Sequence, residues 1–368
     1  MADLFRLADT LGPSRIAHIH NASLGLKAIV VIDNTACGVA VGGVRMAPDV
    51  SAEECFRLAR AMTLKNAAAG LPHGGGKSVI FANPRMPTEK KEQIIRAFAH
   101  AIRDLADYVP GPDMGTDELC MAWIKDETGR SVGLPEAVGG IPLDTVGATG
   151  FGLAVSVDVA RSFIGLELAG ARVVVQGFGA VGKHAARFLA EKGALLVGAS
   201  DSNGTLADPG GLDVNALIAL KDAGRPLRDH PHGRKVDGDA VLDIPCDIWI
   251  PAARPDVVRA DNFARLNTRL IPQGANIPCT AEAEQALHDR GVLVIPDFIA
   301  NAGGVICASI EYRGGTRQAA FDYIDERIRA NTQAVLEDSR RSKTLPRAAA
   351  MALAQTRIRA ATATRRWR

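Results

Sequence analysis

The sequence has no long apolar run and no cysteine pattern of the kind found in membrane proteins or disulfide-stapled proteins. No stretch reaches the about 18 apolar residues that a membrane span needs. The first residues include Asp3 and Arg6 in place of a continuous apolar segment, so we expect no secretory signal. The six cysteines are scattered without a CxxC pair, which favours reduced thiols and a cytoplasmic enzyme with no membrane partner.

An excess of charge of one sign is also missing. Lysine and arginine total 43 against 41 aspartates and glutamates, a net charge of +2, so the composition gives no support for a nucleic-acid partner. Hydrophobic residues make up 47% of the chain and charged residues 23%, as in an ordinary globular enzyme. A chain of 368 residues is too long for one ordinary core, which predicts two domains.

Apolar periodicity assigns the two domains to different kinds of α/β fold. Residues 1–140 mix short strands and helices, which predicts a mixed α/β domain for substrate binding and oligomerisation. Residues 145–329 alternate strands with helices, which predicts a Rossmann-type, doubly wound dinucleotide-binding domain, separated from the first by a cleft. We expect residues 330–368, helical and rich in Ala and Arg, to pack back on the first domain.

Local patterns place the individual elements. A capping box, Ser51-Ala-Glu-Glu54, predicts the start of a helix that ends near Gly70. A second helix is predicted over residues 88–107 and a linker over residues 139–148. The predicted strands cover residues 28–33, 38–42, 172–176, 195–199, 248–250, 269–271 and 292–295.

A glycine fingerprint follows the first predicted strand of the second domain. In Gly177-Phe-Gly179-Ala180-Val181-Gly182, the first glycine allows a tight turn and the second lets a pyrophosphate approach the backbone. The third glycine lets the next helix pack closely on the strand. The start of that helix, which includes Ala180 and Val181, offers backbone N–H groups to phosphates.

An acidic residue follows the next predicted strand. Asp201 is placed to accept a hydrogen bond from a ribose 2′-hydroxyl, which favours NAD because a carboxylate repels the 2′-phosphate of NADP. NADP stays open as the cofactor, since Ser202 could hydrogen-bond a phosphate and Lys183 could lie near it.

Two lysines flank a glycine-rich segment that we expect to be a loop. Lys65 comes late in an alanine-rich helix, and Lys77 follows three glycines. Lysine is rarely buried without a partner, and two ammonium groups that lie close together repel each other. One of them can therefore lose its proton and act as a base near neutral pH.

With these features, several separate motifs together resemble the glutamate/leucine/phenylalanine/valine dehydrogenase family, from about residue 15 to residue 330. Besides the dinucleotide fingerprint, the motifs are Gly42-Gly-Val-Arg45, Met62-Thr-Leu-Lys-Asn-Ala67, Gly74-Gly-Gly-Lys77, Gly111-Pro-Asp-Met-Gly-Thr116, Ala148-Thr-Gly-Phe-Gly152, Gly274-Ala-Asn276 and Pro296-Asp-Phe-Ile-Ala-Asn-Ala-Gly-Gly304. Members of this family convert an L-amino acid reversibly to a 2-oxo acid and ammonia, with NAD or NADP.

The resemblance implies a role for each of the main polar residues. Lys65 would anchor the substrate α-carboxylate, Lys77 would activate the water that attacks the imino carbon, and Asp113 would shuttle protons. The backbone of Gly42 and Gly43 would approach the substrate carboxylate. On the cofactor side, the polar residues near the nicotinamide and its ribose would be Thr149, Asn276 and Asn301.

Two positions of the resemblance argue against glutamate as the substrate. Glutamate enzymes of the family carry a lysine where this chain has Val41, and a serine where it has Ala308. Burying a substrate carboxylate without a cation costs several kcal/mol, so we expect an apolar, branched-chain or aromatic side chain. Further residues expected to line this substrate site are Met62, Gly111 and Val305.

Alternatives stay open at this point. Arg313 could supply the cation for a glutamate side chain, or the chain could be a non-catalytic NAD-binding regulatory protein. His73, beside the glycines, could contact substrate or turn to solvent. The i,i+2 pairs His18/His20 and His230/His232 are more typical of exposed histidines than of a metal site, so we expect no metal. We expect a homo-oligomer whose subunit number the sequence does not choose.

Overall fold

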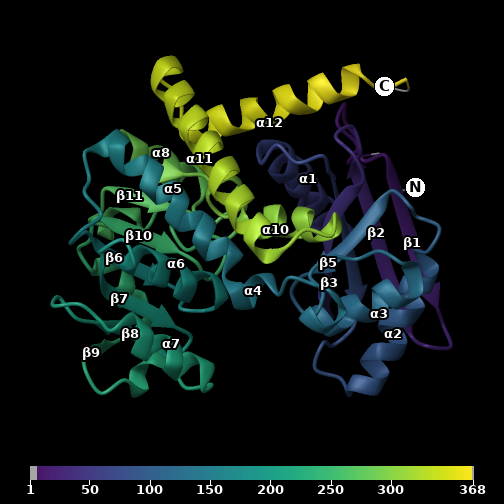
Figure 1. The fold of residues 1–368 in the computed structure, drawn as a ribbon, viewed down its shortest axis with the longest axis horizontal. Coiled ribbons are helices and arrows are strands. Elements are labelled where there is room, and N and C mark those ends of the chain that lie inside the picture. Colours follow the sequence, from purple (N-terminus) through teal and green to yellow (C-terminus); the bar gives the residue numbers. More distant parts are fainter. Residues whose placement is uncertain (1–5, 367–368) are drawn as a thin grey trace. The chain divides into compact units, whose positions relative to one another are not determined.

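The computed structural model describes residues 6–366 (Figure 1). Asp3, one of the residues behind the expectation of no signal segment, lies outside this range. The chain divides into two compact units. Unit 1 comprises Met1–Leu143, Val305–Ala320 and Met351–Arg368, and unit 2 comprises Asp144–Gly304 and Phe321–Ala350.

Unit 1 is built on a five-stranded mixed sheet in the order β1-β2-β4-β3-β5. β1 and β2 pair antiparallel, β4 runs antiparallel to β2, and β3 runs parallel to both β4 and β5. The strands are β1 (Arg15–Asn21), β2 (Leu26–Asn34), β3 (Ala40–Ala47), β4 (Gly74–Phe81) and β5 (Tyr108–Pro112). The helices of its N-terminal part are α1 (Ala52–Ala68), α2 (Thr88–Ala101) and α3 (Glu118–Thr128), with a 3₁₀ turn η1 (Glu136–Val138).

Strand β4 contradicts the prediction of a glycine-rich loop before Lys77. The three glycines are buried within the sheet because their neighbours leave no room for a side chain. A Cβ on Gly74 would lie 1.8 Å from the carbonyl oxygen of Asn34, and one on Gly75 would lie 2.1 Å from the backbone nitrogen of Thr63. Glycine therefore allows α1 to lie directly on β4.

Helix α1 confirms the predicted start, whereas α2 is shorter than predicted. Ser51 caps α1 by accepting the backbone N–H of Glu54 at 3.1 Å. Helix α2 ends at Ala101, since the next carbonyl groups turn toward Arg130, which donates to Ile102 and Leu105 at 2.8 and 2.9 Å. Ile94, Ile95 and Phe98 of α2 are buried in the core of unit 1.

Unit 2 contains a seven-stranded sheet in the order β12-β11-β10-β6-β7-β8-β9. Neighbours from β12 to β7 pair in parallel, and β8 and β9 extend the edge antiparallel, which confirms the Rossmann-type prediction. The strands are β6 (Arg172–Gln176), β7 (Leu195–Asp201), β8 (Gly204–Ala207), β9 (Arg234–Val236), β10 (Ile248–Pro251), β11 (Leu270–Pro272) and β12 (Leu293–Ile295).

The helices of unit 2 connect these strands. They are α5 (Ala148–Ile164), α6 (Ala180–Ala190), α7 (Val214–Asp222), α8 (Ala281–Asp289) and α9 (Asp297–Ala300), after a short α4 (Leu143–Val146) in the predicted linker. Short 3₁₀ turns are η2 (Leu227–Asp229), η3 (Gly238–Asp243) and η4 (Phe263–Arg265). Each predicted strand of this unit has its counterpart within two residues.

The C-terminal helices are α10 (Gly303–Tyr312), α11 (Arg317–Ser342) and α12 (Pro346–Ala363). Residues 305–320, predicted to belong to the dinucleotide domain, group with unit 1, because Ala308 of α10 packs into an apolar cluster with Val41. Residues 321–350 group with unit 2, where Arg347 is anchored to Glu284.

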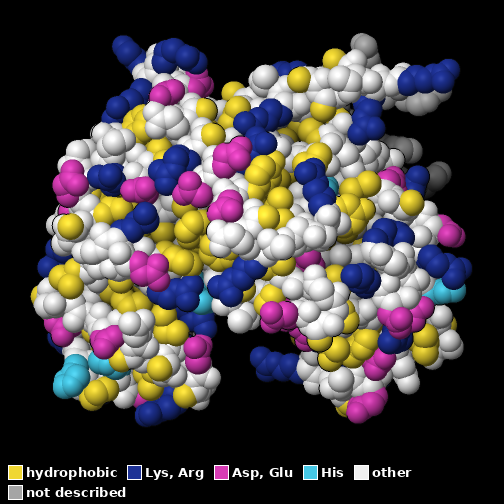
Figure 2. Space-filling model, viewed as in Figure 1, with side chains coloured by type: hydrophobic (Ala, Val, Ile, Leu, Met, Phe, Trp, Pro, Cys, Tyr) yellow, Lys and Arg dark blue, Asp and Glu magenta, His cyan; other side chains and the backbone are white. Residues whose placement is uncertain are grey.

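The face shown in Figure 2 carries Lys and Arg side chains interspersed with Asp and Glu side chains. Across residues 6–366, no helix combines the length and apolar character that crossing a bilayer requires. The six cysteines are all free thiols.

Candidate active site

Two neighbouring strands of unit 1 place the predicted catalytic pair in contact. Lys77 lies on β4, and Asp113 comes directly after β5. The Lys77 Nζ donates a hydrogen bond to Asp113 Oδ2, and the Arg45 Nε lies 3.3 Å from the same oxygen. Arg45 also pairs with Glu54 Oε1 at 2.5 Å. The Lys77 side chain is only 7% exposed, so these charges interact with little screening by solvent.

The surroundings of Asp113 keep its carboxyl group ionised. Burial by itself raises the pKa of this group, but the positive charges of Lys77 and Arg45 and the N–H of Met114 outweigh it and hold the pKa below its ordinary value. Asp113 is therefore a carboxylate at neutral pH and can accept a proton.

The glycines of β3 leave the space that this pair occupies. A Cβ on Gly43 would lie 2.7 Å from the Asp113 Cβ and 3.1 Å from the Lys77 Nζ. A Cβ on Gly42 would lie 1.6 Å from the carbonyl oxygen of Gly76. Any side chain at these two positions would push β3 away from β4 or displace the Lys77–Asp113 pair.

Lys65 and Met62 lie on α1, the helix that packs on β4. Lys65 is in the last turn and half-buried, and Met62 is half-buried one turn earlier. Gly75 of β4 approaches this same stretch of α1 at Thr63, which lies between them in sequence. The two predicted lysines thus sit on adjoining elements of one unit.

Two of the residues predicted to surround the substrate side chain, Val41 and Ala308, meet in one apolar cluster. Val41 of β3 and Ala308 of α10, each 6% exposed, pack with Val109 and Val132. Gly111 joins this wall, since a Cβ there would lie 3.1 Å from a Val132 methyl group. Also on α10, Val305 is half-buried three residues before Ala308.

His73 is buried, not turned to solvent. Its Nε2 lies 2.8 Å from the Ser309 hydroxyl, and its ring contacts Tyr312 edge-on with centroids 5.9 Å apart. Burial, together with the positive charge of Arg313, lowers the pKa of His73 to about 4. The ring is therefore neutral at pH 7 and joins β4 to α10.

The glycine fingerprint forms the turn between β6 and α6 in unit 2. Gly177 has a φ of +94°, a backbone conformation that favours glycine. A Cβ on Gly182 would lie 2.1 Å from the carbonyl oxygen of Gly177, whereas Gly179 faces open space. Ala180 and Val181 form the first turn of α6, where backbone N–H groups have no partners within the helix. This geometry fits a bound pyrophosphate.

Asp201 lies at the end of β7, as predicted, but its carboxylate already has several donors. Oδ2 accepts from the Lys221 Nζ and the backbone N–H of Leu227, each at 2.9 Å, and Oδ1 accepts from the N–H of Asn203 at 2.8 Å. Ser202, predicted to hydrogen-bond a phosphate, is exposed beside it.

The other three residues predicted to bind the cofactor come from separate segments of unit 2. The Asn301 Nδ2 donates to the carbonyl groups of Gly274 and Ala275 and to the Asn276 Oδ1 at 3.2–3.3 Å. Its own Oδ1 is buried without a hydrogen-bond partner among the described residues, so it can accept from a ligand. Thr149 opens α5, whose backbone approaches the segment after Asn301 so closely that only glycine fits at residue 303.

The structure adds two residues to which the sequence alone assigns no role in the site. Arg45 belongs to the quoted Gly42–Arg45 motif, and its ion pairs give it a role in holding Asp113. Glu54 was predicted to complete a capping box, but its side chain pairs with Arg45 instead. The apolar periodicity of β3 and of α1 does not show that the side chains of Arg45 and Glu54 meet.

Within the described range, no three His, Cys, Asp or Glu residues are grouped so that they could hold a metal ion. His18 and His20 are exposed on β1, and the His230 Nδ1 lies 3.0 Å from the carbonyl oxygen of His232.

Two family models match nearly the whole chain. One, described as Glutamate/Leucine/Phenylalanine/Valine dehydrogenase, matches residues 139–366. The other, described as Glu/Leu/Phe/Val dehydrogenase, dimerisation domain, matches residues 16–130.

Two similar proteins are named as glutamate dehydrogenases. The glutamate dehydrogenase of Aeropyrum pernix is 38% identical over 323 residues, 82% of this chain and 77% of the relative. The NADP-specific glutamate dehydrogenase of Saccharolobus shibatae is 38% identical over 293 residues, 76% of this chain and 69% of the relative.

Among solved structures, the hetero-hexameric glutamate dehydrogenase of Thermus thermophilus in its Leu bound form has a TM-score of 0.86 at 28% identity, covering 95% of this chain and 89% of that one. The L-tryptophan dehydrogenase of Nostoc punctiforme has a TM-score of 0.72 at 27% identity, covering 95% and 97%. The chain therefore belongs to the glutamate/leucine/phenylalanine/valine dehydrogenase family and is an amino-acid dehydrogenase that uses NAD or NADP.

Proposed function

We propose that this enzyme deaminates an L-amino acid with an apolar, branched-chain or aromatic side chain, reversibly, to the 2-oxo acid and ammonia. The observation that carries the proposal is the apolar cluster of Val41, Val109, Val132 and Ala308. Two of its members occupy the positions at which glutamate enzymes of the family carry a lysine and a serine. A carboxylate brought against these side chains would lose hydration with no compensating donor from them, at a cost of several kcal/mol.

In the proposed reaction, each polar group of unit 1 has one task. The Lys65 ammonium anchors the α-carboxylate, with the Gly42–Gly43 backbone beside it. Lys77 takes a proton from the attacking water, and Asp113 exchanges protons with the substrate nitrogen. Arg45 holds Asp113 in place and keeps it ionised. The dinucleotide, when bound, supplies the hydride acceptor; we propose that Gly177–Gly182, Asp201, Thr149, Asn276 and Asn301 hold it.

A second candidate substrate is glutamate. The relatives from Aeropyrum pernix and Saccharolobus shibatae are both named glutamate dehydrogenases, and this chain contains a cation close to His73 that could serve the side-chain carboxylate. Arg313 is exposed directly after the end of α10, and its charge reaches the buried imidazole. Such a role would need the Arg313 side chain to turn inward past Tyr312.

A substrate panel tests the proposal. We would measure kcat/KM for glutamate, leucine, valine, isoleucine, phenylalanine and tryptophan, each with NAD and with NADP, from the absorbance of the reduced cofactor. We expect an apolar amino acid to be preferred over glutamate by at least about 100-fold, or about 3 kcal/mol. A preference for glutamate would overturn the proposed substrate class.

The variant Val41→Lys provides a matched test of the pocket. The new ammonium group would give a glutamate carboxylate a partner, so we expect kcat/KM for glutamate to rise and that for the apolar substrate to fall. No gain with glutamate would contradict the assignment of this position. Arg313→Gln separates the two candidates, since it reduces glutamate turnover only if Arg313 binds the side chain.

We further propose that the enzyme is a homo-oligomer formed through unit 1. The family model that matches residues 16–130 is described as a dimerisation domain, and the Thermus thermophilus relative is described as hetero-hexameric. Light scattering coupled to gel filtration would give the subunit number, and a monomer at micromolar concentration would contradict the proposal.

A further inference from the structure

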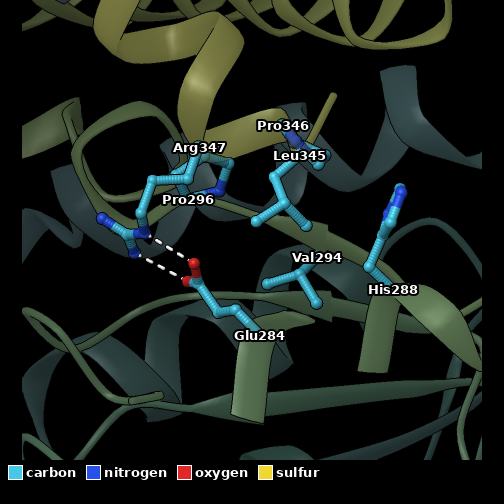
Figure 3. A pocket seen from close by; sticks show the side chains of 7 residues that line it. All are labelled: Glu284, His288, Val294, Pro296, Leu345, Pro346 and Arg347. Carbon is cyan, nitrogen blue, oxygen red and sulfur yellow. Dashed lines mark hydrogen bonds and ion pairs between the residues drawn. The ribbon is translucent and has the colours of Figure 1, made fainter. Parts of the chain in front are cut away.

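A buried ion network in unit 2 joins the start of α12 to the segment Gly274–Ile277. Arg347 Nε and one terminal nitrogen donate to both oxygens of Glu284 at 2.7 and 2.8 Å, as Figure 3 shows. The same terminal nitrogen lies 2.8 Å from Gln273 Oε1 and 2.9 Å from Asp297 Oδ1. The acceptor side chains are almost fully buried, with Glu284 5% and Asp297 8% exposed.

The network holds the segment at both ends. Gln273, which directly precedes Gly274, is fully buried and also donates to Glu284 at 2.6 Å. At the other end, Asp297 Oδ2 accepts the backbone N–H of Ile277 at 2.9 Å. Between these ends, Asn301 binds the carbonyl groups of Gly274 and Ala275 and the side chain of Asn276.

The segment needs such support because its backbone is strained. Ile277 has a φ of +49°, in the left-handed region that a β-branched residue rarely adopts. Such a conformation costs of order 1–3 kcal/mol and persists only where its surroundings fix it, often at active sites. Ile277 is 45% exposed, so packing of its side chain does not supply that support.

The cavity beside Arg347 is not a ligand site. It measures about 10 Å³, room for a single water molecule, and its lining includes Val294, Leu345 and Pro346 (Figure 3). The carboxylates of Glu284 and Asp297 are bound by Arg347 and by fixed backbone and amide donors. The function of the network therefore lies in the segment that it holds in place.

We propose that Arg347 is a positioning residue for the nicotinamide end of the cofactor: through Gln273 and Asp297 it fixes the Gly274–Ile277 segment that carries Asn276. This inference rests on the proposed assignment of Asn276 and Asn301 to the nicotinamide side. The hydrogen bonds of Arg347 go to Glu284, Gln273 and Asp297 and not to the phosphate turn at Gly177–Gly182, so we expect its loss to affect only the nicotinamide end of the dinucleotide.

The test compares Arg347→Met with the control Arg359→Met, an exposed arginine of the same helix. Methionine keeps an apolar stem near the Phe298 ring, which Arg347 covers at 5.6 Å, but removes the charge and every hydrogen bond. We expect kcat to fall about tenfold, because misplacement of the reacting groups slows the chemical step. The inhibition constant of ADP-ribose, which lacks nicotinamide, should stay within about twofold, because its phosphate turn is untouched. Arg347→Lys should restore part of kcat, since one ammonium group can still reach Asp297.

Two results would overturn the inference: an unchanged kcat in Arg347→Met, or an ADP-ribose affinity that falls as much as kcat, which would indicate general damage to unit 2. If Arg347→Met does not fold, Asp297→Asn makes the same test. If the new amide nitrogen faces Arg347, it repels the guanidinium group. If it faces Ile277, it cannot accept the backbone N–H of Ile277. If the wild-type enzyme turns over no amino acid, the proposed function fails instead, and this failure is seen before any variant is made.

Discussion

The substitution Gly43→Ala should disable the enzyme without removing any polar group from the site. The added methyl carbon would lie 2.7 Å from the Asp113 Cβ, 2.9 Å from the Pro112 carbonyl oxygen and 3.1 Å from the Lys77 Nζ. Carbon atoms in contact prefer a separation of about 3.5–4.0 Å, so the end of β5 or the β3 backbone must move by about 1 Å. Strands β3 and β5 resist this movement, because β3 pairs with β4 on one side and with β5 on the other.

A displacement of this size has a predictable kinetic cost. A shift of about 1 Å in a reacting group can reduce the rate about 100-fold, and overpacking costs about 1–3 kcal/mol of stability. Domains of ordinary stability, about 5–15 kcal/mol, stay folded after such a loss. We therefore expect kcat/KM to fall about 100-fold in a folded enzyme with unchanged binding of reduced cofactor.

The assay is steady-state turnover together with urea unfolding and cofactor fluorescence. Gly238→Ala is the matched control, because a Cβ there meets no atom within 4 Å. Wild-type kcat/KM in Gly43→Ala would refute the argument that Lys77 and Asp113 act from the positions they occupy on β4 and after β5. A loss of activity that merely follows the unfolded fraction would refute it as well.

Three further outcomes follow from the same structure. Lys77→Ala should reduce turnover by at least about 1,000-fold while reduced cofactor still binds, as measured by fluorescence titration; wild-type rates would remove Lys77 from the mechanism. Lys221→Met should raise the ratio of kcat/KM for NAD over NADP about tenfold, because the Asp201 carboxylate loses its cation and repels a 2′-phosphate. Lys235→Met is the exposed control. An unchanged ratio in Lys221→Met would contradict this prediction. The pKa of His73 is lowered to about 4 from 6.5, so between these values the unfolded chain binds a proton that the folded chain does not, and stability falls as the pH drops through this window. Between pH 7 and pH 4, the free energy of unfolding of His73→Gln should therefore fall by about 3 kcal/mol less than that of the wild type, as measured by urea unfolding. An equal fall in both proteins would contradict the buried neutral ring.

The dinucleotide unit could be predicted from the sequence because its signals are local. Strands such as Arg172–Gln176 are continuous apolar runs, and the glycines that follow them have fixed offsets. The prediction could not show that Lys221 reaches Asp201, since the two residues lie on different elements and only the packing of α7 brings them together.

In unit 1 the local signals misled in one place. Three consecutive glycines have low strand propensity, so Gly74–Gly76 was predicted to be a loop. Tertiary packing outweighs that propensity, since α1, β2 and Tyr108 each come close enough to exclude a side chain. The pairing of Arg45 with Glu54 could not be predicted for the same reason. Glu54 belongs to a helix, and the apolar periodicity does not give the position of that helix on the sheet.

The bare backbone of β4 separates what can vary in this enzyme from what cannot. Three successive positions before Lys77 tolerate no side chain, so the strand that carries the proposed base can hardly be altered to suit a new substrate. The wall that we propose for the substrate side chain is made elsewhere, by Val41, Val109, Val132 and Ala308, and none of these residues transfers a proton in the proposed reaction. A change of preferred amino acid can therefore proceed by replacing aliphatic residues one at a time, while the deamination machinery is inherited intact.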